Sequence, residues 1–113
     1  MKDKYTVRMT RHAEDDLNEI IAFIARNNPQ TAIKILERIQ TKIKTLDCFP
    51  SRGGYVAELL TKNIKDYRQI TESPWRIIYR IDGKIVNILA IVDSRRNLQS
   101  ILVKKLLKRN GLL

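Results

Sequence analysis

The side chains best suited to bind another molecule are arginines in the second half of this sequence. Arg76 and Arg80 lie four residues apart in an alternating segment, Arg68 precedes them, and Arg95 and Arg96 follow. Guanidinium groups donate paired hydrogen bonds to phosphate and carboxylate oxygens. These arginines therefore predict a surface that attracts either a nucleic-acid backbone or an acidic protein partner.

The overall charge supports the same expectation. The 113 residues carry a formal charge of +10. Residues 1–60 hold ten basic and eight acidic side chains, residues 61–113 hold twelve and four, and no acidic residue follows Ser94. A merely solubilising basic surface is the alternative interpretation.

Composition excludes several classes of protein. With 43% hydrophobic and 30% charged residues, the chain is expected to fold as one domain spanning residues 1–113. We expect no signal peptide, and no apolar run, residues 88–92 included, is long enough to span a membrane. A single Cys48 and a single His12 provide neither a disulfide nor a zinc-ligand cluster, so we expect a cytoplasmic protein without metal or cofactor.

The first half predicts one strand and a helical hairpin. Residues 4–9 alternate, with Tyr5, Val7 and Met9 on one side. Thr10 is suited to cap a helix over residues 11–27, and Asn28-Pro29 to start a second helix reaching residue 46. Two amphipathic helices joined by so short a loop pack antiparallel. Residues 49–65 are expected to be irregular.

The second half predicts three strands, over residues 67–71, 75–81 and 84–92. Asp82-Gly83 is a typical two-residue hairpin turn, which would place residue 81 opposite 84, 80 opposite 85, 78 opposite 87 and 76 opposite 89. One apolar face of the sheet would then pack on the helices. Its members are Trp75, Ile77, Tyr79, Ile81, Val86, Ile88, Ala90 and Val92.

The opposite face would be half polar and lined with arginines. It would carry Arg76, Ile78 and Arg80 opposite Ile85, Asn87 and Leu89, with Asp93 and Arg95 at its end. A helix over residues 98–108 would either cap this face or stay loosely attached. Arg76 pairing with Asp93, Glu58 pairing with Lys62, and Trp75 and Tyr79 as core aromatics are the structural alternatives to functional roles.

Taken together, these features resemble the RelE/ParE superfamily of toxins from type II toxin–antitoxin systems. The resemblance covers nearly the whole chain and implies an α+β fold of order β-α-α-β-β-β(-α), with an antiparallel sheet packed against an αα-hairpin. It also implies a cognate antitoxin and a toxin–antitoxin hetero-oligomer. The residues that carry it are Ala13, Leu17 and Ile20, Pro50 and Gly53, Glu58, Arg68, Trp75 to Arg80, and Arg95 to Leu98.

The superfamily contains two functional classes. RelE-like and YoeB-like members cleave mRNA on the ribosome without a metal, and by resemblance Glu58 would be the general base while Arg76, with Arg68 or Arg95, stabilises the phosphate. Those members carry a tyrosine or histidine near the carboxy terminus. This sequence instead has Ile101 and Asp93 near those places, and His12 is more consistent with a surface or capping residue.

ParE-like members inhibit DNA gyrase, and they resemble this chain more closely in the helical hairpin, the Pro50–Gly53 segment and the missing terminal Tyr or His. We therefore expect a gyrase inhibitor, with mRNA cleavage as the alternative. A basic DNA-binding module is a third possibility, because the second helix exposes Lys34, Arg38 and Lys42. An acidic or amphipathic antitoxin segment is expected over Arg68, Arg76, Arg80, Arg95 and Arg96.

Overall fold

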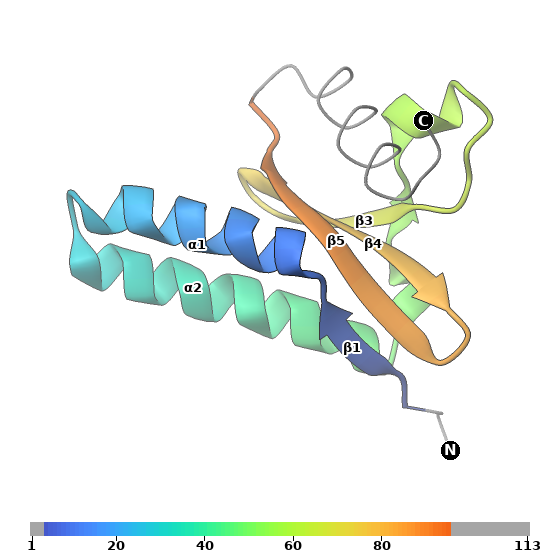
Figure 1. Cartoon of the computed structure of the whole chain (residues 1–113), viewed down its shortest axis with the longest axis horizontal. Coiled ribbons are helices and arrows are strands. Elements are labelled where there is room, and N and C mark those ends of the chain that lie inside the picture. The colour runs from blue at the N-terminus through green and yellow to red at the C-terminus, as the bar shows by residue number, and fades with distance from the viewer. Residues whose placement is uncertain (1–3, 96–113) are drawn as a thin grey trace.

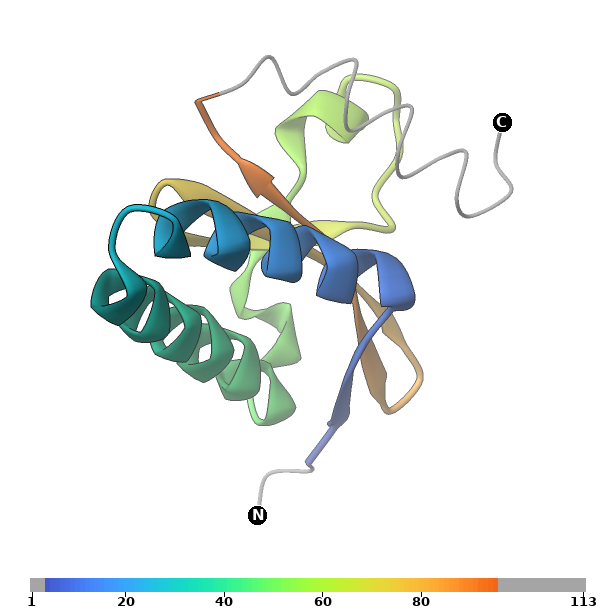
Figure 2. The same cartoon turned by 60° about the vertical axis from the view of Figure 1, so that its left-hand side comes forward.

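The computed structural model describes residues 4–95 and has the predicted α+β architecture (Figure 1). A helical hairpin lies on one face of a five-stranded sheet, as a second view shows (Figure 2). The elements are β1 Thr6–Met9, α1 Arg11–Ala25, α2 Pro29–Lys44, η1 Thr45–Asp47, η2 Pro50–Arg52, β2 Gly54–Tyr55, α3 Ala57–Leu60, β3 Arg68–Glu72, β4 Trp75–Asp82 and β5 Ile85–Asp93.

Both predicted helix starts are confirmed by their capping bonds. The Thr10 hydroxyl accepts a hydrogen bond from the Ala13 amide at 3.2 Å, and the Asn28 side chain accepts one from the Thr31 amide at 3.1 Å. Each cap satisfies an amide that has no partner within its helix. Pro29 occupies the first turn of α2, where its missing amide costs nothing.

The sheet has the strand order β1-β5-β4-β3-β2. Consecutive strands from β2 to β5 pair antiparallel, whereas β1 runs parallel to β5 at one edge. The side chains of Tyr5, Val7 and Met9 point into the core beneath the helices, as their alternation predicts. The chain therefore crosses from one edge strand through the hairpin before it builds the rest of the sheet.

The predicted register of β4 and β5 is wrong by two residues. Asp82 pairs with Ile85, so the turn consists of Gly83-Lys84, and Gly83 adopts a φ of 61° that favours glycine. Asp82 stays in the strand, where its carboxylate accepts hydrogen bonds from the Arg80 and Asn87 side chains. Because side chains alternate with a period of two, residues near the turn still lie on their predicted faces.

A bulge reverses the faces farther along β5. Tyr79 pairs with Ile88 but Ile78 pairs with Ala90, so Leu89 is an extra residue between the two pairs. Ala90 and Val92 therefore lie on the face opposite to the helices, which corrects their predicted placement. The predicted placement of Asp93 on the arginine-lined face is also wrong, because Asp93 lies opposite Trp75 on the helical side.

Two cores result, one on each face of the sheet. The larger packs Leu17, Ile39 and Leu46 of the helical layer against Ile77, Tyr79 and other strand residues. The smaller encloses Ile78 and Leu89 beneath side chains of α3 and the segment that follows it, so this face is not the open arginine-lined surface that was predicted. Its other members are Val56, Leu59, Tyr67, Ala90 and Val92, with Ile64 at the margin.

The segment predicted to be irregular contains β2 and the short helix α3, because backbone pairing to β3 and apolar packing order it. The predicted helix over residues 98–108 lies outside the described residues. Among residues 4–95, no helix has the length and apolar character needed to cross a membrane.

Candidate functional site

The Pro50–Gly53 turn is fixed by two side chains from the sheet. The Tyr79 hydroxyl donates to the Pro50 carbonyl at 2.6 Å and accepts from the Gly53 amide at 3.0 Å. Arg68 donates to the Gly53 carbonyl at 2.7 Å. A side chain at position 53 would collide with the Gln69 backbone and the Tyr79 hydroxyl. Glycine is therefore required at position 53 for this turn to lie against β3 and β4.

Glu58, Arg76 and Gln69 form one hydrogen-bonded cluster on the opposite side of the sheet. The two Arg76 Nη atoms donate to the two Glu58 carboxylate oxygens at 2.7 and 2.8 Å, and Arg76 Nε donates to Gln69 Oε1 at 2.7 Å. The side chains of Arg76 and Glu58 are only 11% and 23% exposed. The pair links α3 to β4 and is not the Glu58–Lys62 or Arg76–Asp93 pairing considered from the sequence.

This geometry determines the acid–base character of Glu58. The hydrogen bonds from Arg76 lower the pKa of the Glu58 carboxyl below its usual value, and partial burial opposes them. A general base is most effective when its pKa lies near neutral pH. Glu58 is therefore a weak base in this state, and its charge neutralises the guanidinium that would otherwise attract a phosphate.

Arg68 and Arg80 line one shallow hollow of about 340 Å³ at the end of the sheet. The guanidinium carbon of Arg68 lies 4.6 Å from the centre of the exposed Tyr55 ring. Arg80 Nε donates to both carboxylate oxygens of Asp82, at 3.0 and 3.1 Å. The hollow also contains Lys65 and Asp66, so its charges are mixed.

Arg95 lies apart from these groups at the end of β5. It donates to both oxygens of Asp93, at 2.9 Å and 2.6 Å for the shortest bond to each. These bonds raise the pKa of the exposed Arg95 guanidinium, which stays fully charged. Arg96 is outside the described residues.

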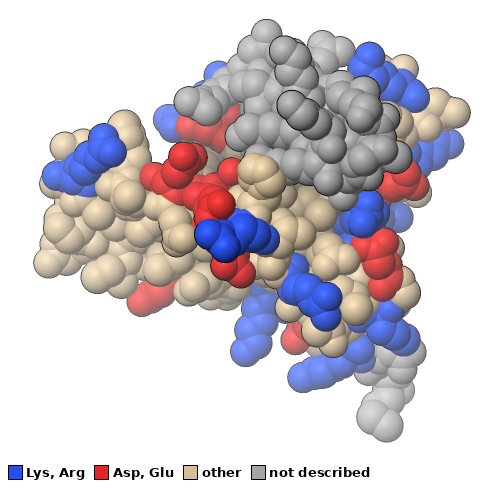
Figure 3. All heavy atoms as spheres, viewed as in Figure 1, with Lys and Arg blue, Asp and Glu red and all other residues tan. Residues whose placement is uncertain are grey.

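The predicted arginines therefore do not form one free basic surface. The acidic groups Glu58, Asp82 and Asp93 each contact one of them, and Figure 3 shows acidic and basic side chains interleaved on the visible face. The structure brings Glu58 together with Arg76, and Arg68 together with Arg80. No cluster of metal-ligating side chains occurs in residues 4–95.

One polar residue with a clear role was missed in the sequence. Asp16 is only 8% exposed, and its carboxylate accepts a hydrogen bond from the Ile91 amide at 3.0 Å. Pairing between β1 and β5 ends at Ile88, so Asp16 satisfies the edge of β5 beyond that point. The signal was an acidic residue beside the apolar positions Ala13 and Leu17 of α1.

Fold and sequence together define the class. The sequence model described as the ParE toxin of the type II toxin–antitoxin system parDE matches residues 7–98, and the chain belongs to this family, within the RelE/ParE superfamily. A curated relative, Toxin ParE3 of Caulobacter vibrioides, is 33% identical over 97 residues, which cover 85% of this chain and 93% of the relative.

Solved structures agree on the fold. A chain of the chromosomal ParDE toxin–antitoxin system from P. aeruginosa superposes with a TM-score of 0.67 at 24% identity, covering 80% of this chain and 97% of that chain. A chain of the RelBE2 toxin–antitoxin complex from Mycobacterium tuberculosis gives 0.54 at 24% identity, covering 80% and 91%. An E. coli RelE toxin mutant in the free state gives 0.60 at 14% identity, covering 94% and 97%.

Proposed function

We propose that this toxin arrests growth by inhibiting DNA gyrase and that a cognate antitoxin neutralises it in a hetero-oligomer. Membership of the ParE family supports the proposal. The observation that carries it is the bidentate Glu58–Arg76 pair, because it occupies the carboxylate and the arginine that mRNA cleavage would require. Inhibition by binding needs neither a free base nor a free catalytic arginine.

The alternative is ribosome-dependent mRNA cleavage, with Glu58, Arg76 and Arg95 as the catalytic groups. One observation favours it: the fold brings two of these groups, Glu58 and Arg76, to the same place, although their pairing leaves neither available in this state. It would require the pair to separate on the ribosome, so that Glu58 could accept a proton and Arg76 could contact the phosphate. Arg95 would also have to leave Asp93.

Two assays on the same protein distinguish these functions. Purified toxin is added to gyrase with relaxed plasmid, and in parallel to a translating extract in which mRNA is followed by primer extension. We expect loss of supercoiled product and intact mRNA. Unimpaired supercoiling together with new mRNA ends would contradict the proposal.

Glu58→Gln provides the matched control, because it removes the base but keeps a hydrogen-bonding side chain of similar size. We expect this variant to inhibit gyrase within about threefold of the parent, after circular dichroism has shown that it is folded. If the parent cleaved mRNA and the Glu58→Gln variant did not, the nuclease function would be supported.

We place the toxin in the cytoplasm, where both candidate targets are found, and fluorescence microscopy of a tagged chain tests this.

A further inference from the structure

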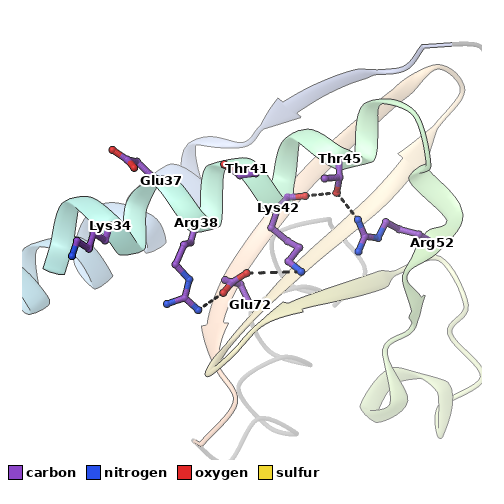
Figure 4. A pocket seen from close by; sticks show the side chains of 8 residues that line it. All are labelled: Lys34, Glu37, Arg38, Thr41, Lys42, Thr45, Arg52 and Glu72. Carbon is purple, nitrogen blue, oxygen red and sulfur yellow. Dashed lines mark hydrogen bonds and ion pairs between the residues drawn. The ribbon is translucent and has the colours of Figure 1, made fainter.

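A second hollow, of about 600 Å³, lies between α2 and the end of β3 (Figure 4). It includes the three basic residues of α2 that the sequence suggested only for a DNA-binding module. Its lining comes from α2, from the short helices η1 and η2 that follow it, and from the end of β3. Lys34, Arg38 and Lys42 follow one side of α2, Arg52 belongs to η2, and Glu72 ends β3. The helix rises about 1.5 Å per residue, so the hollow extends about 16 Å from Lys34 to Thr45.

The hollow has an excess of positive charge. Four basic and two acidic side chains line it. Glu72, the more enclosed acid, contacts Arg38 and lies 3.8 Å from Lys42, so it is already neutralised within the protein. Arg52 donates to the Thr45 hydroxyl at 2.7 Å, which orients its guanidinium beside the end of α2. Contacts within the protein therefore orient Arg38, Lys42 and Arg52.

The chemical character of the walls distinguishes between possible partners. Most of their exposed surface is apolar, contributed by the threonine methyl groups and the aliphatic stems of the basic residues. A phosphate backbone would use only the charges, whereas a peptide with alternating acidic and apolar side chains would use both. Three of the predicted arginines, Arg76, Arg80 and Arg95, already pair with carboxylates, whereas Arg52 donates to a neutral hydroxyl.

We propose that the hollow along α2 is the docking site for an acidic, amphipathic segment of the antitoxin. This inference rests on the proposed function, because it assumes that an antitoxin exists. Carboxylates of the segment pair with Lys34 and Arg52 at the two ends of the hollow, while its apolar side chains cover the aliphatic stems between them. The docking site thus differs from the sheet arginines to which the sequence pointed.

Charge reversal at the two ends of the hollow tests the proposal. The variant Lys34→Glu/Arg52→Glu leaves the Glu72 contacts intact, and circular dichroism verifies its fold. The matched control is Lys62→Glu/Lys65→Glu, which makes the same change in net charge at two exposed lysines in the segment after α3. Titration calorimetry measures binding of the purified antitoxin from the same operon at 0.15 M salt.

We expect the Kd for the antitoxin to rise at least tenfold in the α2 variant and less than threefold in the control. Gyrase inhibition by the α2 variant should match that of the parent. Equal weakening in both variants, or unchanged binding in the α2 variant, would overturn the docking site. If the parent toxin itself binds no antitoxin, the proposed function is wrong.

A DNA-binding assay tests the remaining alternative, that the hollow binds nucleic acid. The same proteins are titrated against a 30-base-pair DNA duplex, and we expect the α2 variant and the control to bind it equally. Selective loss of duplex binding in the α2 variant, with antitoxin affinity retained, would make the hollow a nucleic-acid surface and would overturn the proposal.

Discussion

Removing one partner of the Glu58–Arg76 pair is expected to destabilise the protein more than removing a surface ion pair would. The charges approach within 2.7 Å, and both side chains are largely covered. For charge centres about 4 Å apart and an effective dielectric constant near 20, the attraction is about 4 kcal/mol. Desolvation offsets part of it, so we expect a coupling energy of about 2 to 3 kcal/mol.

The assay is a double-mutant cycle of Glu58→Ala, Arg76→Ala and the double variant, measured by urea unfolding. Arg76→Ala should cost about 3 kcal/mol, because it leaves both Glu58 and Gln69 without their donor. The double variant should cost less than the sum of the single changes. A coupling energy below about 0.5 kcal/mol would refute the reasoning, since that is typical of an exposed pair.

The pH dependence of stability provides an independent check. The pKa of Glu58 in the folded protein lies below its usual value of 4.5. The contribution of the ionised Glu58 to the free energy of unfolding is therefore fully present above pH 4.5. It is lost as the pH falls through the lower pKa of the folded state. The stability difference between the parent and Glu58→Gln should shrink accordingly. A difference that stays constant between pH 7 and the acid limit of folding would contradict the assignment.

Three further changes test the contacts that build the fold. Gly53→Ala should lower the unfolding free energy by more than about 2 kcal/mol, because the new methyl group meets the neighbouring backbone; wild-type stability in urea would contradict this. Tyr79→Phe should cost about 1 to 3 kcal/mol through loss of its two bonds to the 50–53 turn, and an unchanged melting temperature would count against those bonds. Asp16→Ala should cost a similar amount and increase hydrogen exchange at the Ile91 amide, whereas unaltered protection there would exclude the proposed role of the carboxylate.

Local periodicity and capping residues were sufficient to predict several elements of this protein from its sequence. Alternation placed Tyr5, Val7 and Met9 in the core, and capping residues fixed where both long helices begin. Their signals lie within a few residues of the structures they specify. The RelE/ParE resemblance then predicted correctly that these elements form an antiparallel sheet packed against a helical hairpin.

The contacts between side chains far apart in the sequence could not be predicted, because they depend on the complete fold. The bulge at Leu89 reversed the faces of β5, because one extra residue changes a period-two pattern in a way that composition does not reveal. Packing brings Glu58 to Arg76 across 18 residues of sequence, and it brings Asp16 to the Ile91 amide across 75 residues. Pairing choices of this kind depend on the whole fold, since each charged or polar group takes the nearest partner that burial leaves available.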